Sequence, residues 1–269
     1  MRVIAATVDL AEKYGTSVTC LWESNSELGA DFLDLFKEPK RFNISSKNEG
    51  KLLSSYKTSA VKRIIAKFWN SLRGLDYYFS AENVDRIVTE SGVYDFRLFF
   101  QKIEPLVAAK KNICFVSGNY LADLKDVSMF EPKDEIMMRI NEYACKFNEH
   151  TYGLHIRRTD NRWAIEHSPI SMFCEVIEKK LKDEPDAKFY LSTDDPETVE
   201  FLKTKYENFL IIRPKHYGRE NIEAMEDAVI DMWILSKTKS IFGSYFSSFS
   251  EMAALLGGRN VLIMKFLNE

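Results

Sequence analysis

The sequence lacks the cysteine patterns that mark metal-binding and disulfide-rich proteins. Its four cysteines are widely spaced and include no C-x-x-C pair: Cys20, Cys114, Cys145 and Cys174. This spacing indicates neither a zinc site nor a disulfide framework. We therefore expect buried, reduced thiols, as in a cytosolic protein.

Long apolar runs and an excess of basic residues are also missing. No apolar run approaches the roughly 20 residues of a membrane-spanning helix, and the opening segment acquires Asp9, Glu12 and Lys13 too early for a signal peptide. We therefore expect no integral membrane segment and a cytoplasmic location. The chain has 37 Lys and Arg residues against 40 Asp and Glu residues, a net charge of -3, which is not the basic footprint of a nucleic-acid binder.

The second half of the chain alternates short apolar runs with helical patterns. The apolar runs predict five strands, at 151–157, 187–193, 209–214, 240–245 and 260–265. Predicted helices begin at Ser168-Pro169 and Asp195-Pro196 and cover 221–238 and 247–258, the last closed by glycine. Strands that alternate with helices are typical of a doubly wound parallel sheet in the α/β class.

The first half is less regular. We predict helices at 1–15, 26–36 and 132–150, strands at 16–22 and 112–118, and loop with exposed helix in the Lys/Ser-rich segment 45–63. These patterns indicate a smaller α/β domain. We divide the chain into an N-terminal domain, residues 1–140, and a C-terminal nucleotide-binding domain, residues 141–269.

Polar residues gather where four of the predicted strands end. They lie in the segments 155–161, 192–195, 213–219 and 243–250. Because ligands of open parallel sheets bind beyond the carboxyl ends of the strands, these segments predict a ligand site.

Arg157 is the predicted diphosphate ligand, since a guanidinium matches phosphate oxygens and stays charged. Side chains alternate along a strand, so His155 and Arg157 should point one way and Arg158 the other. The alternative is a structural arginine that bridges to Asp160 or Asp194.

The segment 247–251 predicts a helix start that doubles as an anion site. Ser248 and Glu251 form an S-x-x-E capping-box pattern, and Ser247 and Ser248 also offer hydroxyls beside free helix N–H groups. Glu251 is expected to cap the helix or to face the sugar.

Two carboxylates follow the strand at 187–193. We expect Asp195 to act as a helix N-cap before Pro196, which leaves Asp194 free to contact a ligand. The adjacent pair is not a D-x-D motif, and no His/Asp cluster has metal-ligand spacing, so we predict no metal.

Asp231 lies within an apolar helical stretch, where a carboxylate is costly unless paired. It either accepts the two adjacent N–H groups of guanine or forms a salt bridge to Arg213, Lys215 or Arg219; the sequence leaves both open. Two tryptophans, Trp163 and Trp233, are expected to be packing residues.

Together these segments resemble the fucosyltransferase superfamily of α1,6-fucosyltransferases, rhizobial nodulation fucosyltransferases and protein O-fucosyltransferases. The resemblance spans about residues 130–265 and rests on His155-x-Arg157-Arg158-Thr-Asp160, Tyr190-Leu-Ser-Thr-Asp-Asp195, and Asp231 followed by Phe246-Ser247-Ser248. It implies a GT-B fold of two Rossmann-like domains and inverting transfer of fucose from GDP-fucose to a glycan acceptor. It also implies no metal and no cofactor besides the donor, in a bacterial surface-glycan pathway.

The resemblance also implies roles for individual residues. Arg157 resembles the arginine on the donor β-phosphate, His155 and Asp231 resemble the groups around the guanosine, and Asp195 resembles a donor-site carboxylate. Ser247 and Ser248 resemble the phosphate-binding hydroxyls. For the general base, Glu166 is the nearest match to a glutamate that follows this motif, and Asp160 is the fallback.

The chain departs from the family pattern at its beginning. Members usually carry a first strand and a glycine-rich G-x-G-N-R loop before the first helix, whereas this chain starts on the helix itself. We expect this sequence to begin too late, with loss or weakening of sugar transfer. The competing hypothesis is a GDP-binding protein without catalysis that serves an interaction or regulatory role.

Overall fold

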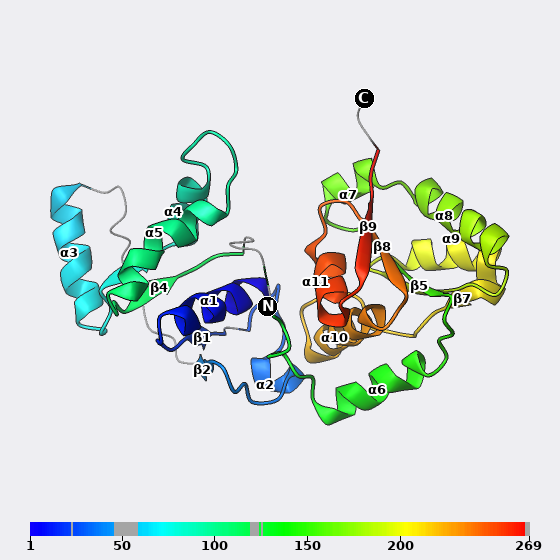
Figure 1. The fold of residues 1–269 in the computed structure, drawn as a ribbon, viewed down its shortest axis with the longest axis horizontal. Helices are drawn as coiled ribbons and strands as arrows, with labels where there is room; N and C mark the ends of the chain where they lie inside the picture. The colour runs from blue at the N-terminus through cyan, green and yellow to red at the C-terminus, as the bar shows by residue number, and fades with distance from the viewer. Residues whose placement is uncertain (23, 46–58, 119–123, 125, 267–269) are drawn as a thin grey trace. The chain divides into compact units, whose positions relative to one another are not determined.

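The computed structural model describes residues 1–22, 24–45, 59–118, 124 and 126–266. These residues form two compact units, each considered by itself (Figure 1). Unit 1 comprises Met1–Glu23 and Glu38–Phe130, and unit 2 comprises Ser24–Lys37 and Glu131–Glu269.

Unit 2 contains a five-stranded sheet in which every neighbouring pair is parallel. The strand order is β7-β6-β5-β8-β9. The strands are β5 (Thr151–Ile156), β6 (Lys188–Thr193), β7 (Leu210–Ile211), β8 (Ser240–Ser244) and β9 (Asn260–Met264). The predicted parallel α/β sheet is therefore confirmed.

Helices connect the strands and cover both faces of this sheet. Helices α8 and α9 lie on one side, and α10 and α11 lie on the other (Figure 1). The helices of unit 2 are α2 (Phe32–Leu35), α6 (Asp134–Ala144), α7 (Arg162–His167), α8 (Ile170–Asp183), α9 (Pro196–Tyr206), α10 (Ile222–Ser236) and α11 (Ser248–Gly257), with a 3₁₀ turn at Glu207–Phe209.

Strand β5 is buried on both faces, and alternation assigns its side chains. Tyr152, Leu154 and Ile156 join a core cluster with residues of α8 and α9. His155 therefore points to the opposite face, where it stacks on Phe249 of α11. This is the strand phase that the sequence predicted for His155.

The strand predicted at 209–214 is much shorter than expected. Only Leu210–Ile211 pair with β6, at the edge of the sheet. Beyond them the Arg213 side chain turns toward α10 and binds Asp227 and Asp231. The predicted strand therefore gives way to a loop that carries Arg213 toward α10.

The helix predicted at 26–36 forms only at Phe32–Leu35. Asn25 and Leu28 pair as a short antiparallel bridge, and the Gly29 N–H donates to the carbonyl of Arg219 at 2.7 Å. A Cβ on Gly29 would lie 2.2 Å from the Glu220 backbone. This close approach to the 219–221 segment replaces helical pairing there.

Unit 1 contains two short parallel strand pairs, β1 with β2 and β3 with β4. Its elements are α1 (Arg2–Lys13), β1 (Thr19–Leu21), β2 (Asn43–Ser45), α3 (Ala60–Ser71), β3 (Tyr77–Phe79), α4 (Ala81–Val88), α5 (Arg97–Ala108) and β4 (Ile113–Phe115). A core cluster joins β3, α4 and α5: Phe79, Val84, Ile87, Val88, Phe99 and Ile103. Of the predicted segment 45–63, residues 46–58 lie outside the described residues, and the exposed helix is α3.

The four cysteines are free, but the expectation that they are all buried is wrong. Cys174 is buried, Cys20 and Cys114 are half-buried, and Cys145 is exposed at the end of α6. In the part of the chain that the structure describes, no helix combines the length and apolar character required to cross a membrane.

Candidate functional site

The carboxyl edge of the unit 2 sheet has a switch point between β5 and β8. The chain proceeds from β5 outward to β6 and β7, then returns to place β8 on the other side of β5. The loops after β5 and β8 therefore diverge, and this is where open α/β sheets bind ligands. The predicted segments 155–161 and 243–250 flank this point.

His155 is a buried, neutral imidazole beside the switch point. It is 5% exposed, and its ring stacks on Phe249 with centroids 4.7 Å apart. Its Nδ1 is buried and has no hydrogen-bond partner among the described residues. Burial lowers the pKa of His155 to about 3, and the charge of Arg157 adds to this effect. A buried polar atom of this kind is ordinarily satisfied by a ligand or water.

Arg157 and Arg158 follow β5 and take different partners. Arg157 Nε lies 2.9 Å from Asp160 Oδ1 and 3.0 Å from Asp194 Oδ2. The Arg158 guanidinium instead donates to the carbonyl of Ile165 at 3.2 Å. The bridging contacts considered for Arg157 are therefore present, to both carboxylates.

Of the two carboxylates that contact Arg157, Asp160 is the one that an anion can displace, because the Asp194 side chain is only 19% exposed. Asp160 is 58% exposed on its side chain, so its ion pair is weak and screened. Burial pulls the pKa of Asp160 upward, but the hydrogen bond and charge of Arg157, together with the charge of Arg219, outweigh it and lower the pKa below its usual value. A phosphate with two charged oxygens can compete with one exposed carboxylate for the guanidinium.

Asp194 and Asp195 have different structural roles. Asp194 accepts the Arg158 N–H at 2.7 Å and the Thr159 hydroxyl at 2.6 Å, so it fixes the loop after β5. Asp195 caps α9 by accepting the N–H groups of Glu197 and Thr198. The N-cap predicted for Asp195 is confirmed, and Asp194 is not free of protein partners.

The turn after β8 presents the N-terminus of α11. Ser247 is the N-cap residue, but its side chain makes no capping bond, so the capping box predicted for Ser248 and Glu251 is wrong. Ser247 is 8% exposed, whereas Ser248 is exposed. The helix can pack this close to β8 because residue 243 is a glycine: a Cβ there would lie 2.3 Å from the Ser250 hydroxyl.

The residue before this helix adopts an unusual backbone. Phe246 has a φ of 55°, a left-handed conformation that is rare for residues other than glycine, and its side chain is 69% exposed. Its carbonyl accepts the Asn161 side-chain N–H at 2.9 Å, which ties the loop after β8 to the loop after β5. Strained backbone of this kind clusters at ligand sites.

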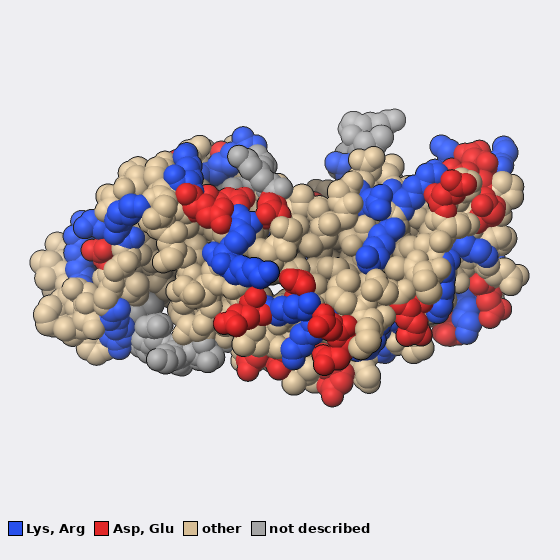
Figure 2. Space-filling view, turned by 60° about the horizontal axis from the view of Figure 1, so that its bottom comes forward, with Lys and Arg blue, Asp and Glu red and all other residues tan. Residues whose placement is uncertain are grey.

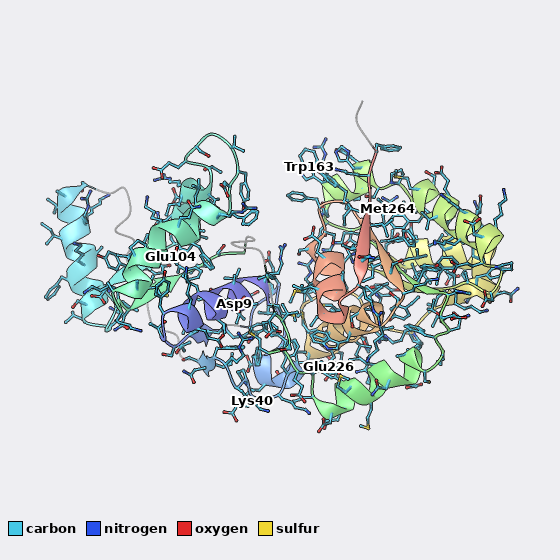
Figure 3. The ribbon with its side chains drawn as sticks, viewed as in Figure 1. Asp9, Lys40, Glu104, Trp163, Glu226 and Met264 are labelled. Atoms are coloured by element: carbon cyan, nitrogen blue, oxygen red, sulfur yellow. The ribbon has the colours of Figure 1, made fainter. Side chains whose placement is uncertain are left out.

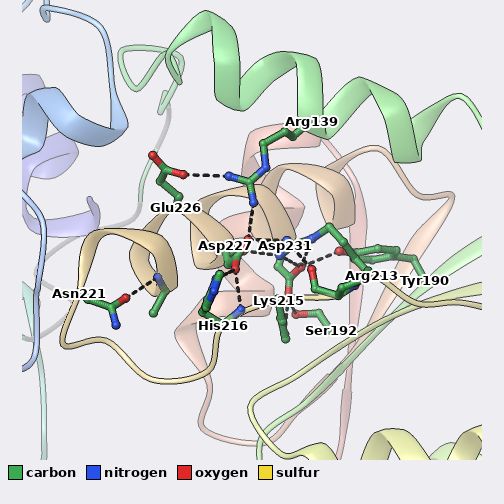
Figure 4. Close-up of polar contacts among 12 residues, drawn as sticks. Arg139, Tyr190, Ser192, Arg213, Lys215, His216, Asn221, Glu226, Asp227 and Asp231 are labelled. Atoms are coloured by element: carbon green, nitrogen blue, oxygen red, sulfur yellow. Dashed lines mark hydrogen bonds and ion pairs between the residues drawn. The ribbon is translucent and has the colours of Figure 1, made fainter.

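A buried ion cluster lies beneath the loop after β7 (Figure 4). Arg213 bridges two carboxylates one helical turn apart on α10: its Nη1 lies 2.5 Å from Asp227 Oδ1 and its Nη2 lies 2.9 Å from Asp231 Oδ1. Arg139 of α6 contacts the same Asp227 oxygen at 2.7 Å. Because Arg213 is 4% exposed on its side chain, the cluster is part of the interior.

Asp231 is fully occupied by protein partners. Tyr190 donates to Oδ1 at 2.6 Å. Ser192 and Lys215 contact Oδ2 at 2.9 Å and 2.5 Å. Burial alone would raise the pKa of Asp231, but the charges of Lys215 and Arg213 outweigh it and lower the pKa to about 2. Of the partners proposed from sequence, Arg213 and Lys215 pair with Asp231, and the bonds recorded for Arg219 go to other groups.

The two candidate general bases lie on the surface after β5. Glu166 sits on α7 and pairs with Arg162 at 2.7 Å, with its side chain 47% exposed. Asp160 lies in the loop before that helix and pairs with Arg157 and Arg219. Both carboxylates can therefore be reached from solvent.

The two tryptophans behave differently. Trp233 is 8% exposed and packs against Phe36, as expected. Trp163 is 56% exposed and stacks on His167 with ring centroids 5.5 Å apart, so it packs at the surface and not in the core. It lies near the end of β9, marked by Met264 in Figure 3. The Ser168 hydroxyl donates to the carbonyl of Met264, which fixes that arrangement.

Two residues of this region, Asp227 and Arg139, were missed by sequence reasoning as members of the site. The spacing of Asp227 and Asp231, four apart on a helix, was a signal for a shared cation. Phe246 belongs to the motif that the sequence showed, but its left-handed backbone conformation was not predicted.

The structure resembles solved fucosyltransferases over most of its length. NodZ α-1,6-fucosyltransferase co-crystallised with GDP matches with a TM-score of 0.58 at 16% identity, over 94% of this chain and 86% of that chain. A variant of Arabidopsis thaliana FUT1 in complex with GDP gives 0.54 at 14% identity, over 98% and 74%. POFUT1 in complex with GDP-fucose gives 0.53 at 9% identity, over 96% and 92%.

No protein-family model and no curated protein matches the chain. At these identities the likeness shows the fold alone, and that fold is similar to the fold of these solved fucosyltransferases. Activity has to be argued from the site.

Proposed function

We propose that unit 2 binds GDP-fucose and that the protein is an inverting fucosyltransferase. The observation that carries the proposal is the switch point between β5 and β8. There the motif arginine, a buried imidazole with an unsatisfied Nδ1 and the N-terminus of α11 flank one position at the sheet edge. A guanidinium and free helix N–H groups are ligands for a diphosphate. The similar structures named above carry GDP or GDP-fucose.

In this proposal Arg157 and the N-terminus of α11 hold the diphosphate, with Ser247 and Ser248 as further donors. His155 lies toward the nucleoside, where its neutral Nδ1 accepts from or donates to the ligand. Asp194 keeps the Arg157 loop in place through its bonds to the loop backbone. Asp195 supports the site only through α9, which it caps.

The reaction is a displacement at the anomeric carbon. An acceptor hydroxyl attacks from the face opposite the nucleotide, the bond between that carbon and the β-phosphate oxygen breaks, and GDP leaves with the electron pair. The hydroxyl proton passes to a carboxylate, with Glu166 as the first candidate and Asp160 as the second. Charge grows on the β-phosphate during departure, so Arg157 stabilises the transition state more than the bound donor.

Recognition of guanine by Asp231 requires a rearrangement. Both carboxylate oxygens are occupied by protein donors. Lys215 is the more accessible of the two cations, with 12% of its side chain exposed against 4% for Arg213. We propose that the guanine base displaces the Lys215 ammonium from Oδ2 and that Arg213 stays in place.

The remaining details of the proposal rest on the sequence analysis, including the resemblance. They are a GT-B arrangement, a division near residue 140 into acceptor-side and donor-side domains, a cytoplasmic location and a glycan acceptor of the bacterial cell surface.

The second candidate is a GDP-binding protein without transferase activity. It is favoured by one observation: Arg157 and Asp231 already have protein partners, as structural residues do. The two candidates share nucleotide binding and differ in turnover.

Thermal unfolding with GDP, ADP and UDP tests the donor, because a ligand of the native state raises apparent stability. A shift with GDP alone supports the assignment, and equal shifts with all three nucleotides contradict it. Incubation with GDP-fucose and an acceptor panel then separates the candidates. Product that persists in EDTA supports a metal-free transferase, whereas GDP binding with neither product nor donor hydrolysis supports the second candidate.

A further inference from the structure

Helix α3 presents its large apolar side chains to solvent and not to the unit it belongs to. Its most exposed apolar residues are each more than half exposed: Val61 67%, Ile64 70%, Ile65 53%, Phe68 67% and Leu72 66%. The buried residues of the helix are the small or polar Ala66 and Asn70. A helix on the surface of a globular protein ordinarily buries its apolar face. Helix α3 does the opposite, because its apolar face is exposed.

The exposed apolar residues form one continuous stripe. At about 100° per residue, the five side chains from Val61 to Leu72 fall within an arc of roughly 100°. Ala66 and Asn70 lie on the opposite side, which packs against the unit. Lys62 and Lys67 are exposed and flank the stripe, each about 60° beyond one of its edges.

The charge of the helix has a single sign. The sequence AVKRIIAKFWNS holds three basic residues and no carboxylate, in a chain whose net charge is -3. In Figure 2 the surface in the region of α3, at the left of the view, is mostly tan with patches of blue and a smaller patch of red. The helix therefore carries an apolar stripe flanked by cations, whereas the rest of the chain has a net negative charge.

We infer that α3 binds to the surface of an anionic lipid bilayer. Such helices lie in the plane of the interface with the apolar face among the acyl chains and the cations at the headgroups. The lysines beside the stripe can extend to lipid phosphates while their stems stay apolar. The helix has 12 residues and is about 18 Å long, which suits lying along a bilayer and not crossing it.

A protein partner fits this face less well. The core of a protein interface is depleted in lysine, and here lysines border the stripe on both sides. A second copy docked on the same face would bring two sets of lysines together, and α3 supplies no carboxylate to pair with them. The inference does not depend on the donor or on turnover.

Vesicle co-sedimentation of the full chain tests the inference without any substrate. We expect binding to vesicles of phosphatidylcholine with phosphatidylglycerol, weaker binding to phosphatidylcholine alone, and weakening in high salt. The double variant Ile64→Ser with Phe68→Ser should lower the vesicle partition coefficient by about tenfold for each side chain. Lys62→Glu with Lys67→Glu should remove the preference for anionic vesicles.

Matched controls keep these results specific to α3. Met138→Ser with Phe201→Ser changes two exposed apolar residues, 65% and 43% exposed, on α6 and α9 of unit 2 and should leave binding unchanged. Thermal unfolding should be the same for all variants, since every changed side chain is exposed.

Three outcomes would overturn the inference. The protein could stay in the supernatant with anionic vesicles, or the serine variant of α3 could bind them as tightly as the unmodified chain. Alternatively, sedimentation could show a dimer that the α3 serine variant dissolves, with no vesicle binding, in which case a second copy covers the face.

Discussion

Replacing Asp231 by Asn tests the buried ion cluster most directly. The substitution keeps the shape of the side chain but removes the charge that Arg213 and Lys215 contact at 2.9 Å and 2.5 Å. The pKa of Asp231 is lowered from 3.8 to about 2. At 1.36 kcal/mol for each pKa unit, this depression corresponds to about 2 kcal/mol of folding stability.

The loss expected for Asp231→Asn at pH 7 is about 2 to 4 kcal/mol. The upper value applies because two buried cations lose one of their carboxylates, and breaking a buried pair costs more than the pair contributes. A carboxylate whose pKa is lower in the folded state stabilises the protein fully above the unfolded pKa near 4. That contribution disappears as the pH falls toward the folded pKa of about 2.

Urea unfolding followed by circular dichroism at pH 7, 5, 4 and 3 measures the effect. The difference in the free energy of unfolding between the unmodified chain and Asp231→Asn should be largest at pH 7 and 5. It should shrink as the pH falls toward the folded pKa of Asp231, and since the other carboxylates titrate in both proteins, their effect cancels in the difference. Glu200→Gln, an exposed change on α9, is the control and should leave stability unchanged. A difference that stays constant with pH, or a variant as stable as the unmodified chain, would refute the reasoning.

Four further substitutions test the site. Arg157→Ala should lower turnover by roughly 10²–10³-fold with little loss of stability. Arg158→Ala should lower stability more and turnover less. Steady-state kinetics and thermal unfolding measure both effects, and the reverse ranking would mean that the roles of the two side chains are assigned wrongly. Lys215→Met should raise GDP affinity by roughly tenfold in calorimetry, because the base no longer has to displace a charged hydrogen bond at Asp231; weaker binding would mean that Lys215 itself holds the nucleotide. His155→Phe should remove a loss of stability that begins below about pH 6.5, since the folded pKa of about 3 keeps His155 neutral while the unfolded chain takes up a proton. Identical pH–stability curves for the two proteins would contradict that buried state.

The sequence determined the α/β pattern of unit 2 and the place of its ligand site. Strand length, helix period and the turn residues between them are local properties, and they were sufficient to predict β5, β6, β8 and β9 within a few residues. The gathering of polar residues after each strand then followed from one rule, that parallel strands end at a common edge. Asp195 as an N-cap was equally local.

Tertiary structure decided which of the candidate residues are paired. The sequence left Asp231 between guanine and a salt bridge, and packing of the loop after β7 brought Arg213 and Lys215 to it. Strand β7 likewise ends at Ile211, before the residues that reach Asp231. Such outcomes depend on which segments meet across the fold, and no periodicity within either segment encodes them.

The apolar face of α3 also separates what the sequence determines from what the tertiary structure determines. Its sequence fixes a helix with an apolar stripe flanked by lysines, because side-chain directions along a helix follow from its period. A pattern of that kind ordinarily predicts that the stripe is buried. Only the tertiary structure placed Ala66 and Asn70 against the unit and left Ile64 and Phe68 in solvent, because burial is a property of what surrounds a helix and not of the helix alone.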